Sequence, residues 1–433
     1  MFRKTIEELE QDAREKLVID MRSAAEYEKE TYPGAINIEK DDFEQHIGEL
    51  PKDKPIYLIC YTGQKSDEIA ETLSNQGYEI YSIDGGYRSW LRIKLARLME
   101  QPEEVERRAG DVERSIIKKF RKEIWRKFTR AINEYELIKD GDKIAVCISG
   151  GKDSMLMAKL FQELLRHGKK NFELVFLVMN PGYNQINYET ILNNAKLLEV
   201  PITVFKTEIF DIVAGVGNPQ DESAGTHGES LSIQGESLGN HGESKGSRGE
   251  LLGSRGDPLG SPCYLCARMR RGYLYSKAKE LGCNKIALGH HYDDVIETIL
   301  MGMLYGGQMQ TMMPKLHSTN FEGMELIRPL YLVREQDIIH WANYNKLHFI
   351  QCACRFTESC ASCGGTEKGS KRAEIKELIR QLAAKDPVIE NNIFRSVENV
   401  NLSTVIAYKK DGVKHHFLDT YDHYTEAESI PLE

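Results

Sequence analysis

Three groups of residues in this sequence have types and spacings that could perform chemistry, and the first centres on one cysteine. Cys60 begins the run CYTGQKS (residues 60–66), which follows a short apolar segment and opens a helical pattern. Backbone N–H groups and the helix dipole would therefore surround the sulfur, and Lys65 adds positive charge. These effects lower the pKa of a thiol and stabilise a thiolate or a persulfide. The run predicts a sulfur-carrying cysteine, although a lone cysteine at a strand end is usually a buried core residue.

The second group is the run SGGKDS (residues 149–154), directly after the apolar segment 143–148. Glycines let the backbone approach a phosphate closely, and the N-terminus of a following helix favours an anion. The lysine supplies charge and the two serines supply hydroxyl donors, while the spacing of a Walker A loop is absent. We predict a nucleotide-binding loop in which Lys152 and Asp153 are also catalytic. The predicted binding residues are Ser149, Gly150, Gly151, Lys152, Asp153 and Ser154.

The third group consists of cysteines in close pairs. Clustered cysteines in a reducing compartment more often bind metal or perform redox chemistry than form disulfides. Cys263 and Cys266 have chelating spacing, which suits zinc or an iron–sulfur cluster without choosing between them. Cys147 and Cys283 are expected to be structural. The further pairs are Cys352/Cys354 and Cys360/Cys363.

Polar residues also follow the apolar segment 285–288, in the run GHHYDD (residues 289–294). Asp293 and Asp294, at the carboxyl end of a strand, could hold Mg²⁺ near a bound phosphate group. We assign Gly289 and His290 to the nucleotide. Shortly before this run, three closely spaced arginines add positive charge suited to RNA phosphate. They are Arg268, Arg270 and Arg271.

Alternating strand and helix patterns must position these residues. In the first 95 residues, the short apolar runs 17–20 and 56–60 are typical of buried parallel strands. From residue 143 the order is strand, helix, strand, helix and strand, which predicts a parallel, doubly wound sheet. The fold class is therefore α/β in both units. Later helices are expected at 264–281, 334–347 and 371–385, with a strand at 285–288.

The segment between the two units is helical in pattern and strongly basic. Residues 114–130 contain eight lysines and arginines against one acid, a local charge of +7 in a chain whose net charge is −9. A solvated helix face is one interpretation. The sharper interpretation is a contact surface for nucleic acid, because phosphate contacts need clustered lysines and arginines.

Residues 216–262 form a low-complexity stretch. It contains a seven-residue repeat with glycine at positions 228, 235, 242, 249 and 256. A second series of glycines, at positions 239, 246, 253 and 260, destroys helix propensity, so the repeat does not predict a coiled coil. We predict a flexible insertion in the second α/β unit.

The first 95 residues resemble a single-domain rhodanese. The resemblance rests on DMR (20–22), YPGAIN (32–37), the six-residue loop 60–65 and DGGY (84–87). It implies a sulfurtransferase in which Cys60 carries a persulfide. Tyr61 and Lys65 stand where many rhodaneses have arginines, which bears on substrate preference. An inactive, regulatory rhodanese is the alternative.

Residues 114–385, apart from the insertion, resemble the tRNA 2-thiocytidine synthetase family of PP-loop ATP pyrophosphatases, whose fold is adenine nucleotide α-hydrolase-like. The resemblance implies cleavage of ATP to AMP and pyrophosphate. It also implies a [4Fe-4S] cluster with one open iron, held by Cys263, Cys266 and either Cys352 or Cys354. The Cys360/Cys363 pair is then an insertion, a separate metal site or unused thiols. The matching motifs are SGGKDS, CYLCARMRRG (263–272), KIALGHHYDD (285–294) and IRPL (327–330).

The resemblances predict four segments in this chain of 433 residues, whose 41% apolar content is enough for real cores. A rhodanese-like domain precedes a basic linker that contacts tRNA, then a PP-loop thiolation domain and a C-terminal tail. Their expected bounds are 1–95, 96–140, 141–385 and 386–433.

The joint prediction is an ATP-dependent tRNA thiolase. The C2 oxygen of a base is adenylated and then replaced by sulfur delivered through the cluster, with the rhodanese domain as persulfide carrier. Expected partners are tRNA, a persulfide donor such as a cysteine desulfurase and, as one option, a second copy of the chain. A lysidine-type or amide-forming ligase and a non-catalytic, redox-sensing tRNA-binding protein are the alternatives. No apolar run reaches membrane length and the first residues lack an apolar signal core, so we expect a cytoplasmic protein with no membrane contact.

Overall fold

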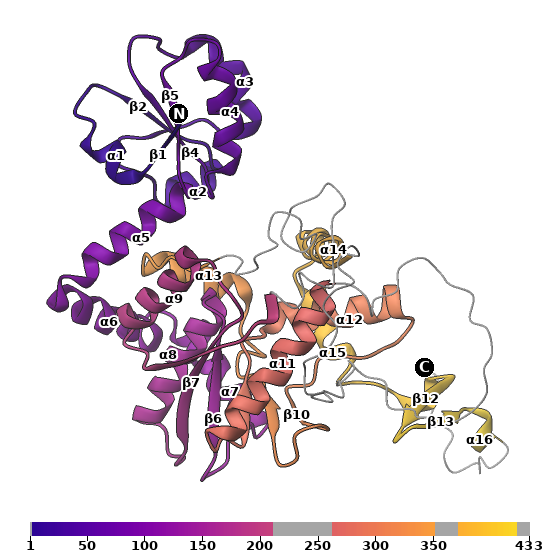
Figure 1. The fold of residues 1–433 in the computed structure, drawn as a ribbon. Helices are drawn as coiled ribbons and strands as arrows, with labels where there is room; N and C mark the ends of the chain where they lie inside the picture. Colours follow the sequence, from indigo (N-terminus) through magenta and orange to yellow (C-terminus); the bar gives the residue numbers. More distant parts are fainter. Residues whose placement is uncertain (1, 211–261, 351–370, 422–433) are drawn as a thin grey trace, which may run out of the picture.

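The computed structural model describes residues 2–210, 262–350 and 371–421 (Figure 1). Two sheets with surrounding helices confirm the predicted α/β class. Nearly all of the glycine-rich stretch lies outside the described residues, as do Cys352, Cys354, Cys360 and Cys363. Among the helices that are described, none combines the length and the apolar character that a membrane span requires.

The N-terminal unit is built on a five-stranded sheet in the order β1-β5-β4-β2-β3, in which every neighbouring pair is parallel. The central strand β4 is buried along its whole length, which explains its uninterrupted apolar sequence. Cys60 follows β4, so the carboxyl edge of this sheet positions the reactive-cysteine run. The strands are β1 (Arg3–Lys4), β2 (Leu17–Asp20), β3 (Ile36–Asn37), β4 (Ile56–Ile59) and β5 (Ile80–Ile83). The helices are α1 (Ile6–Gln11), α2 (Ala24–Lys29), α3 (Phe43–His46), α4 (Gln64–Ser74) and α5 (Gly86–Met99).

The second unit has a six-stranded sheet in the order β10-β11-β9-β6-β7-β8, in which only the β10–β11 pair is antiparallel. Strands β7 and β9 flank β6 on opposite sides, so a crevice forms at the carboxyl ends of β6 and β9. The runs SGGKDS and GHHYDD follow these two strands and meet there. The strands are β6 (Lys143–Ile148), β7 (Glu173–Asn180), β8 (Ile202–Lys206), β9 (Lys285–Ala287), β10 (Lys315–His317) and β11 (Glu325–Ile327). The helices are α8 (Lys152–His167), α9 (Gln185–Leu197), α11 (Pro262–Glu280), α12 (Tyr292–Gly306) and α13 (Glu335–Tyr344).

The basic linker is helical, as predicted, but it contains a change of helix type. Helix α6 (Pro102–Ile117) is followed by a π-helical turn (Arg121–Trp125) and then by α7 (Arg126–Glu134). Apolar residues recur every four positions and are all buried, so the lysines and arginines between them face outward. The buried residues are Ile116, Phe120, Ile124 and Phe128. One continuous hydrophobic core runs from the N-terminal unit through α5 and α6 into the second unit.

The C-terminal part packs onto the second unit. Helices α14 (Lys371–Lys385) and α15 (Val388–Ser396) both contact α12. The ring of Phe394 stacks on Tyr292 with 4.6 Å between the centroids, so α15 belongs to the packed unit although the sequence placed it in a tail. A hairpin of β12 (Ala407–Lys410) and β13 (Val413–His416) follows, and then α16 (Leu418–Tyr421).

Candidate active site

The loop that follows β4 holds the sulfur of Cys60 in a nest of donors. Its Sγ accepts hydrogen bonds from the Gly63 N–H at 3.1 Å and from the Ser66 hydroxyl at 3.2 Å. The residue is only 3% exposed. Donors aimed at the sulfur can stabilise negative charge there. The structure therefore places Cys60 as the sequence expected, at a strand end and before a helix, while its burial also fits a core cysteine.

Gly86 packs against the backbone of this loop. It has a φ of +58°, and a Cβ added there would lie 2.1 Å from the Cys60 carbonyl oxygen and 2.7 Å from the Gly63 nitrogen. The next residue, Tyr87, donates its N–H to the Cys60 carbonyl at 2.8 Å. The conformation of the cysteine loop therefore depends on the absence of a side chain at Gly86.

Replacing Gly86 with alanine should lower the free energy of unfolding by about 1–3 kcal/mol, because the new methyl group meets backbone atoms that cannot move freely. The displaced loop should also change the rate at which iodoacetamide alkylates Cys60. Urea denaturation and mass spectrometry of the alkylated protein measure the two effects. Gly48→Ala is the matched control, since a Cβ at Gly48 has nothing within 4 Å. Equal stability and alkylation in the two variants would contradict the expectation.

The loop after β6 is shaped for a phosphate group. Helix α8 begins at Lys152, and no side chain caps its N-terminus, so its first N–H groups are available to a ligand. The Ser154 hydroxyl donates to the Gly151 carbonyl at 3.0 Å and accepts the Ser149 N–H at 3.2 Å, which closes the loop. A Cβ at Gly289 would lie 3.2 Å from the Ser154 nitrogen, so the GHHYDD segment packs directly on this loop.

A cavity of about 470 Å³ lies over the loop, and we call it the ATP cavity. It is lined by residues from β6, β7, α8, α11 and the GHHYDD segment. Most of the predicted binding residues thus share one space, but Gly150, Gly151 and Asp293 do not line it. The predicted residues that do are Ser149, Lys152, Asp153, Ser154, Gly289, His290 and Asp294.

Lys152 carries the positive charge of this cavity. Its ammonium lies 3.2 Å from Asp153 Oδ1 and 3.0 Å from Glu335 Oε1. Burial alone would lower the pKa of Lys152, but the two carboxylates outweigh burial and raise it, so the side chain stays charged. Burial would likewise raise the pKa of Glu335, yet hydrogen bonds from Lys376 and Lys152 lower it to about 2.

Asp153 is the carboxylate of the cavity that best suits a cation. Its Oδ1 is buried and accepts no hydrogen bond among the described residues. Burial raises the pKa of Asp153, because a partly desolvated carboxylate lacks full compensation for its charge. A divalent cation beside the phosphates would supply that compensation.

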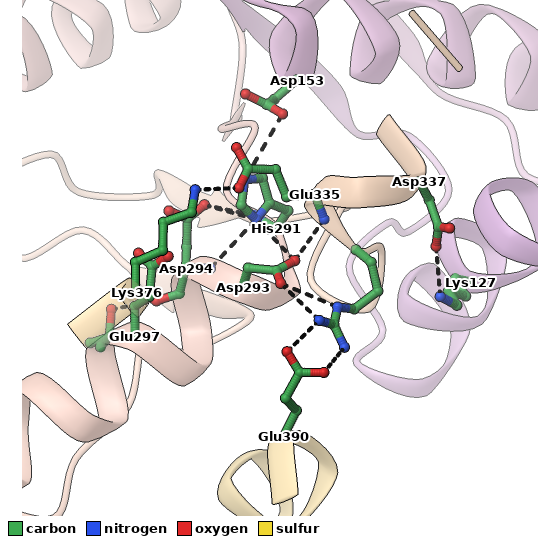
Figure 2. A network of polar contacts seen from close by, with 12 residues as sticks. Lys127, Asp153, His291, Asp293, Asp294, Glu297, Glu335, Asp337, Lys376 and Glu390 are labelled. Carbon is green, nitrogen blue, oxygen red and sulfur yellow. Dashed lines mark hydrogen bonds and ion pairs between the residues drawn. The ribbon is translucent and has the colours of Figure 1, made fainter. Parts of the chain in front are cut away.

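Asp293 and Asp294 form hydrogen bonds and ion pairs with the segments next to the nucleotide loop (Figure 2). Asp293 Oδ2 accepts the Glu335 N–H at 2.6 Å, and its other oxygen lies 3.1 Å from the Arg334 guanidinium. Asp294 accepts the His291 N–H at 3.0 Å and pairs with Arg372 at 2.6 Å. In the described ranges no group of three histidine, cysteine or acidic side chains could hold a metal ion. The assignment of these two aspartates to Mg²⁺ stays a prediction.

Glu335 is the site residue that sequence analysis missed. Its backbone N–H is held by Asp293 and its side chain by Lys376 (Figure 2). Its side chain also accepts a hydrogen bond from Lys152, so it links α13 to the loop. An acidic residue at the first position of a helix is common because it complements the helix dipole. Nothing in the sequence therefore distinguishes Glu335 from an acidic residue that only stabilises its own helix.

His290 is buried in the wall of the ATP cavity, and its Nδ1 has no hydrogen-bond partner among the described residues. Burial and the nearby Arg328 guanidinium lower its pKa to about 4, from an ordinary value of 6.5. The ring is therefore neutral at pH 7 and can accept a hydrogen bond from a ligand.

The free energy of unfolding should fall as the pH drops from about 6.5 to about 4. In that window the unfolded chain protonates His290 and the folded chain does not, which gives a slope of up to about 1.4 kcal/mol per pH unit. Urea denaturation of a His290→Asn variant should show a shallower slope than the parent protein. His415→Asn, in the half-buried part of β13 and outside the lining of the ATP cavity, is the control. A slope that is unchanged by His290→Asn would refute the expectation.

Of the cysteines predicted to bind a cluster, only Cys266 has a described side chain. It lies on α11 and packs against the buried cluster that contains Ile209 and Phe210. Arg270 is one turn further along the helix, lines the ATP cavity and donates to the Tyr183 hydroxyl at 3.0 Å. Cys263 is on the first turn of α11, but its side chain lies outside the described ones. Cys147 and Cys283 are buried and not disulfide-bonded.

A second cavity of about 420 Å³ lies between the two units, and we call it the interdomain cleft. The N-terminal unit contributes Tyr61, next to Cys60, and the second unit contributes Lys152, Asp153 and Glu335. Because those last three residues also line the ATP cavity, the two cavities adjoin. The cysteine loop and the nucleotide loop therefore open onto connected space.

Polar contacts and packed helices fix the two units beside this cleft. His348 Nε2 lies 2.6 Å from Glu30 Oε2. Arg92, on α5, pairs with Glu189, on α9, at 3.4 Å, and these two helices pack along each other. The relative placement of the two loops is thus set by direct contacts on both sides of the cleft.

Fold and site together define the class of protein: a PP-loop nucleotide-binding domain joined to a rhodanese-like domain. The rhodanese-like domain family matches residues 5–93. The PP-loop domain family matches residues 265–354.

Curated relatives identify the family more closely. A tRNA-cytidine(32) 2-sulfurtransferase from Alcanivorax borkumensis is 32% identical over 295 residues, which cover 67% of this chain and 86% of that protein. The protein of the same name from Geobacter sulfurreducens is 30% identical over 271 residues, which cover 63% of this chain and 87% of the relative. The chain belongs to the tRNA-cytidine(32) 2-sulfurtransferase family.

Solved structures give more distant matches. The U34-tRNA thiolase NcsA from Methanococcus maripaludis, solved with its [4Fe-4S] cluster, has a TM-score of 0.44 and 21% identity, covering 64% of this chain and 78% of that chain. A rhodanese-like domain protein from Staphylococcus aureus has a TM-score of 0.20 and 24% identity, covering 21% of this chain and 91% of that chain.

Proposed function

We propose that this chain thiolates a cytidine in tRNA, at the expense of ATP, with Cys60 as the carrier of the incoming sulfur. The observation that carries the proposal is the interdomain cleft, because the loop of Cys60 and the loop of Lys152 both border it. Membership of a family whose relatives are named tRNA-cytidine(32) 2-sulfurtransferases supports the same reaction.

In the proposed reaction the C2 oxygen of the base attacks the α-phosphate of ATP, and pyrophosphate leaves. Sulfur then bonds to C2, and the oxygen departs with AMP. Because a persulfide carries sulfur at the sulfane level, two electrons from a reductant must accompany its delivery. The chain's own groups stabilise the charge on the phosphates: the Lys152 ammonium and the uncapped N-terminus of α8.

Two further groups belong to the proposal. Mg²⁺ would bind at the ATP cavity, where Asp153 has a buried oxygen that accepts no hydrogen bond among the described residues and Asp294 lines the wall. A [4Fe-4S] cluster would be held by Cys263, Cys266 and either Cys352 or Cys354, and such a cluster supplies an iron open to sulfur. Cys266 packs against the same buried cluster as Tyr183, which lines the cavity. Ile350, the last described residue before Cys352, packs beside Gly150 of the loop.

The proposed partners are tRNA and a persulfide donor such as a cysteine desulfurase, with a homodimer as a further expectation. The proposed location is the cytoplasm, where tRNA and a reducing environment coincide. The domain bounds 1–95, 96–140, 141–385 and 386–433 likewise remain proposals.

Mass spectrometry of tRNA nucleosides tests the function. Purified protein, ATP, Mg²⁺, a persulfide donor, a reductant and unmodified tRNA should yield a 2-thiocytidine, together with AMP and pyrophosphate. A lysine or amide adduct would instead identify a different PP-loop ligase. Absence of ATP turnover in the presence of tRNA would contradict an enzymatic function.

A further inference from the structure

A third cavity, of about 890 Å³, lies between α5, α6 and the end of α13, and we call it the basic groove. Its lining includes eight lysines and arginines but only three carboxylates. The floor is apolar, because Leu95 and Val112 are buried beneath it. The groove therefore combines an apolar floor with a positively charged rim.

All three carboxylates of the groove are already paired with neighbouring cationic side chains. Glu30 pairs with Lys94 and with His348. Glu104 pairs with Arg107 at 2.6 Å, and Asp111 pairs with Arg114 at 3.0 Å. The remaining cations therefore determine the charge that a ligand meets.

Three exposed lysines remain on the rim: Lys118, Lys119 and Lys346. Within the described residues none of them forms an ion pair. The Lys119 ammonium lies 4.3 Å from the centre of the Tyr344 ring, and this tyrosine is 52% exposed. Ammonium groups beside an accessible aromatic ring are a combination that suits the backbone and bases of a nucleic acid.

The basic groove also leads to the reaction site. It shares Leu91 and His348 with the interdomain cleft. The cleft in turn shares Lys152, Asp153 and Glu335 with the ATP cavity. The three spaces thus lie in series, from a cationic surface to the cysteine loop and then to the nucleotide loop.

We propose that the basic groove binds the phosphate backbone of the tRNA substrate, so that one flipped nucleotide enters the interdomain cleft. The proposal rests on the function proposed above. A tRNA strand matches this arrangement, because its phosphate backbone is anionic and its bases extend from that backbone. An enzyme that modifies a base must take that base out of the stack. The backbone can then lie in the basic groove while the flipped base lies in the interdomain cleft. The surface of an acidic protein would match the positive charge of the basic groove, but it would place no reactive group in the interdomain cleft. Helix α5, from the rhodanese-like unit, then contributes RNA affinity as well as holding the sulfur carrier in place.

The test is the affinity for fluorescently labelled tRNA, measured by anisotropy over a range of salt concentrations. The groove variant carries Lys118→Glu, Lys119→Glu and Lys346→Glu. We expect its Kd at low salt to rise by about 10- to 100-fold, and the slope of log Kd against log salt to fall by about 2 to 3, since each lost phosphate contact removes close to one unit.

The matched control reverses three exposed lysines on the hairpin of β12 and β13, namely Lys409, Lys410 and Lys414. A second groove variant with glutamine at the same three positions guards against misfolding caused by the reversed charges. ATP binding by each variant reports whether the nucleotide loop is intact.

Unchanged tRNA affinity and salt slope in both groove variants would overturn the proposal. If the groove variants keep their tRNA affinity but lose the loading of Cys60 by a persulfide donor, the groove docks an acidic protein and the proposal is equally wrong. Failure of the proposed function looks different: the parent protein would bind tRNA through the groove and form no thionucleoside.

Discussion

The Lys152→Ala variant should form thionucleoside at about one hundredth to one thousandth of the parent rate, the usual cost of removing one group that stabilises charge in a transition state. The ammonium belongs to the first residue of α8, and it lies between Asp153 and Glu335. Its removal leaves Asp153 facing the phosphates of ATP without its lysine, while Glu335 keeps only its pair with Lys376. Release of pyrophosphate in the presence of tRNA measures the loss.

Lys376→Ala is the matched control for this variant. Lys376 also pairs with Glu335, at 2.5 Å, but it does not line the ATP cavity. Its loss should cost less than about tenfold, because it removes a support of Glu335 and no charge that faces the nucleotide. Comparable losses in the two variants would show that Lys152 acts only by supporting Glu335, contrary to its proposed contact with phosphate.

The Cys60→Ser variant should lose donor-dependent thiolation by about 100-fold or more, because a carrier in the same chain raises the effective concentration of sulfur at the site. Serine retains the size of the side chain and can still accept from Gly63 and Ser66, so the fold of the loop should persist. ATP binding should be unchanged. Supplying inorganic sulfide in excess should restore thiolation, because sulfide bypasses the carrier.

Cys283→Ser serves as the control, since Cys283 is buried in the second unit and lines neither the ATP cavity nor the interdomain cleft. Parent-like thiolation by the Cys60→Ser protein with a persulfide donor would exclude the relay. It would leave the rhodanese-like unit as an inactive or regulatory domain, the alternative that the sequence left open.

The strands that carry the site could be predicted from sequence because their physical signal is local. Strand β6 is buried between neighbouring strands, and its run of apolar residues ends where the strand ends, at Ile148. The run SGGKDS then has to form a turn before a helix. The same reasoning located Cys60 at the end of β4.

The cleft could not be predicted, because it depends on how distant segments pack. Helix α5 lies against α9. His348 pairs with Glu30, and these two residues are more than 300 positions apart in the sequence. No pattern within either segment specifies its partner. Glu335 was missed for a related reason, since its contact with Lys152 exists only after α13 docks on the loop.

The C-terminal helix α15 is another segment whose packing depends on distant partners. Four of its nine residues are apolar, and the sequence analysis assigned them to the proposed C-terminal tail. The helix is held by long-range contacts: Phe394 stacks on Tyr292, and Glu390 pairs with Arg334 at 2.6 Å. Through Arg334 and Asp293, α15 supports the segment that positions Glu335.

The most direct test follows one sulfur atom from Cys60 to the base. The protein is loaded with ³⁴S as the Cys60 persulfide, freed of excess donor, and mixed with ATP, Mg²⁺, a reductant and unmodified tRNA for a single turnover, with unlabelled sulfide present in solution. We predict that mass spectrometry finds ³⁴S in the thionucleoside at a level close to that of the loaded persulfide. A thionucleoside that contains only the unlabelled sulfur would contradict transfer from Cys60 through the interdomain cleft.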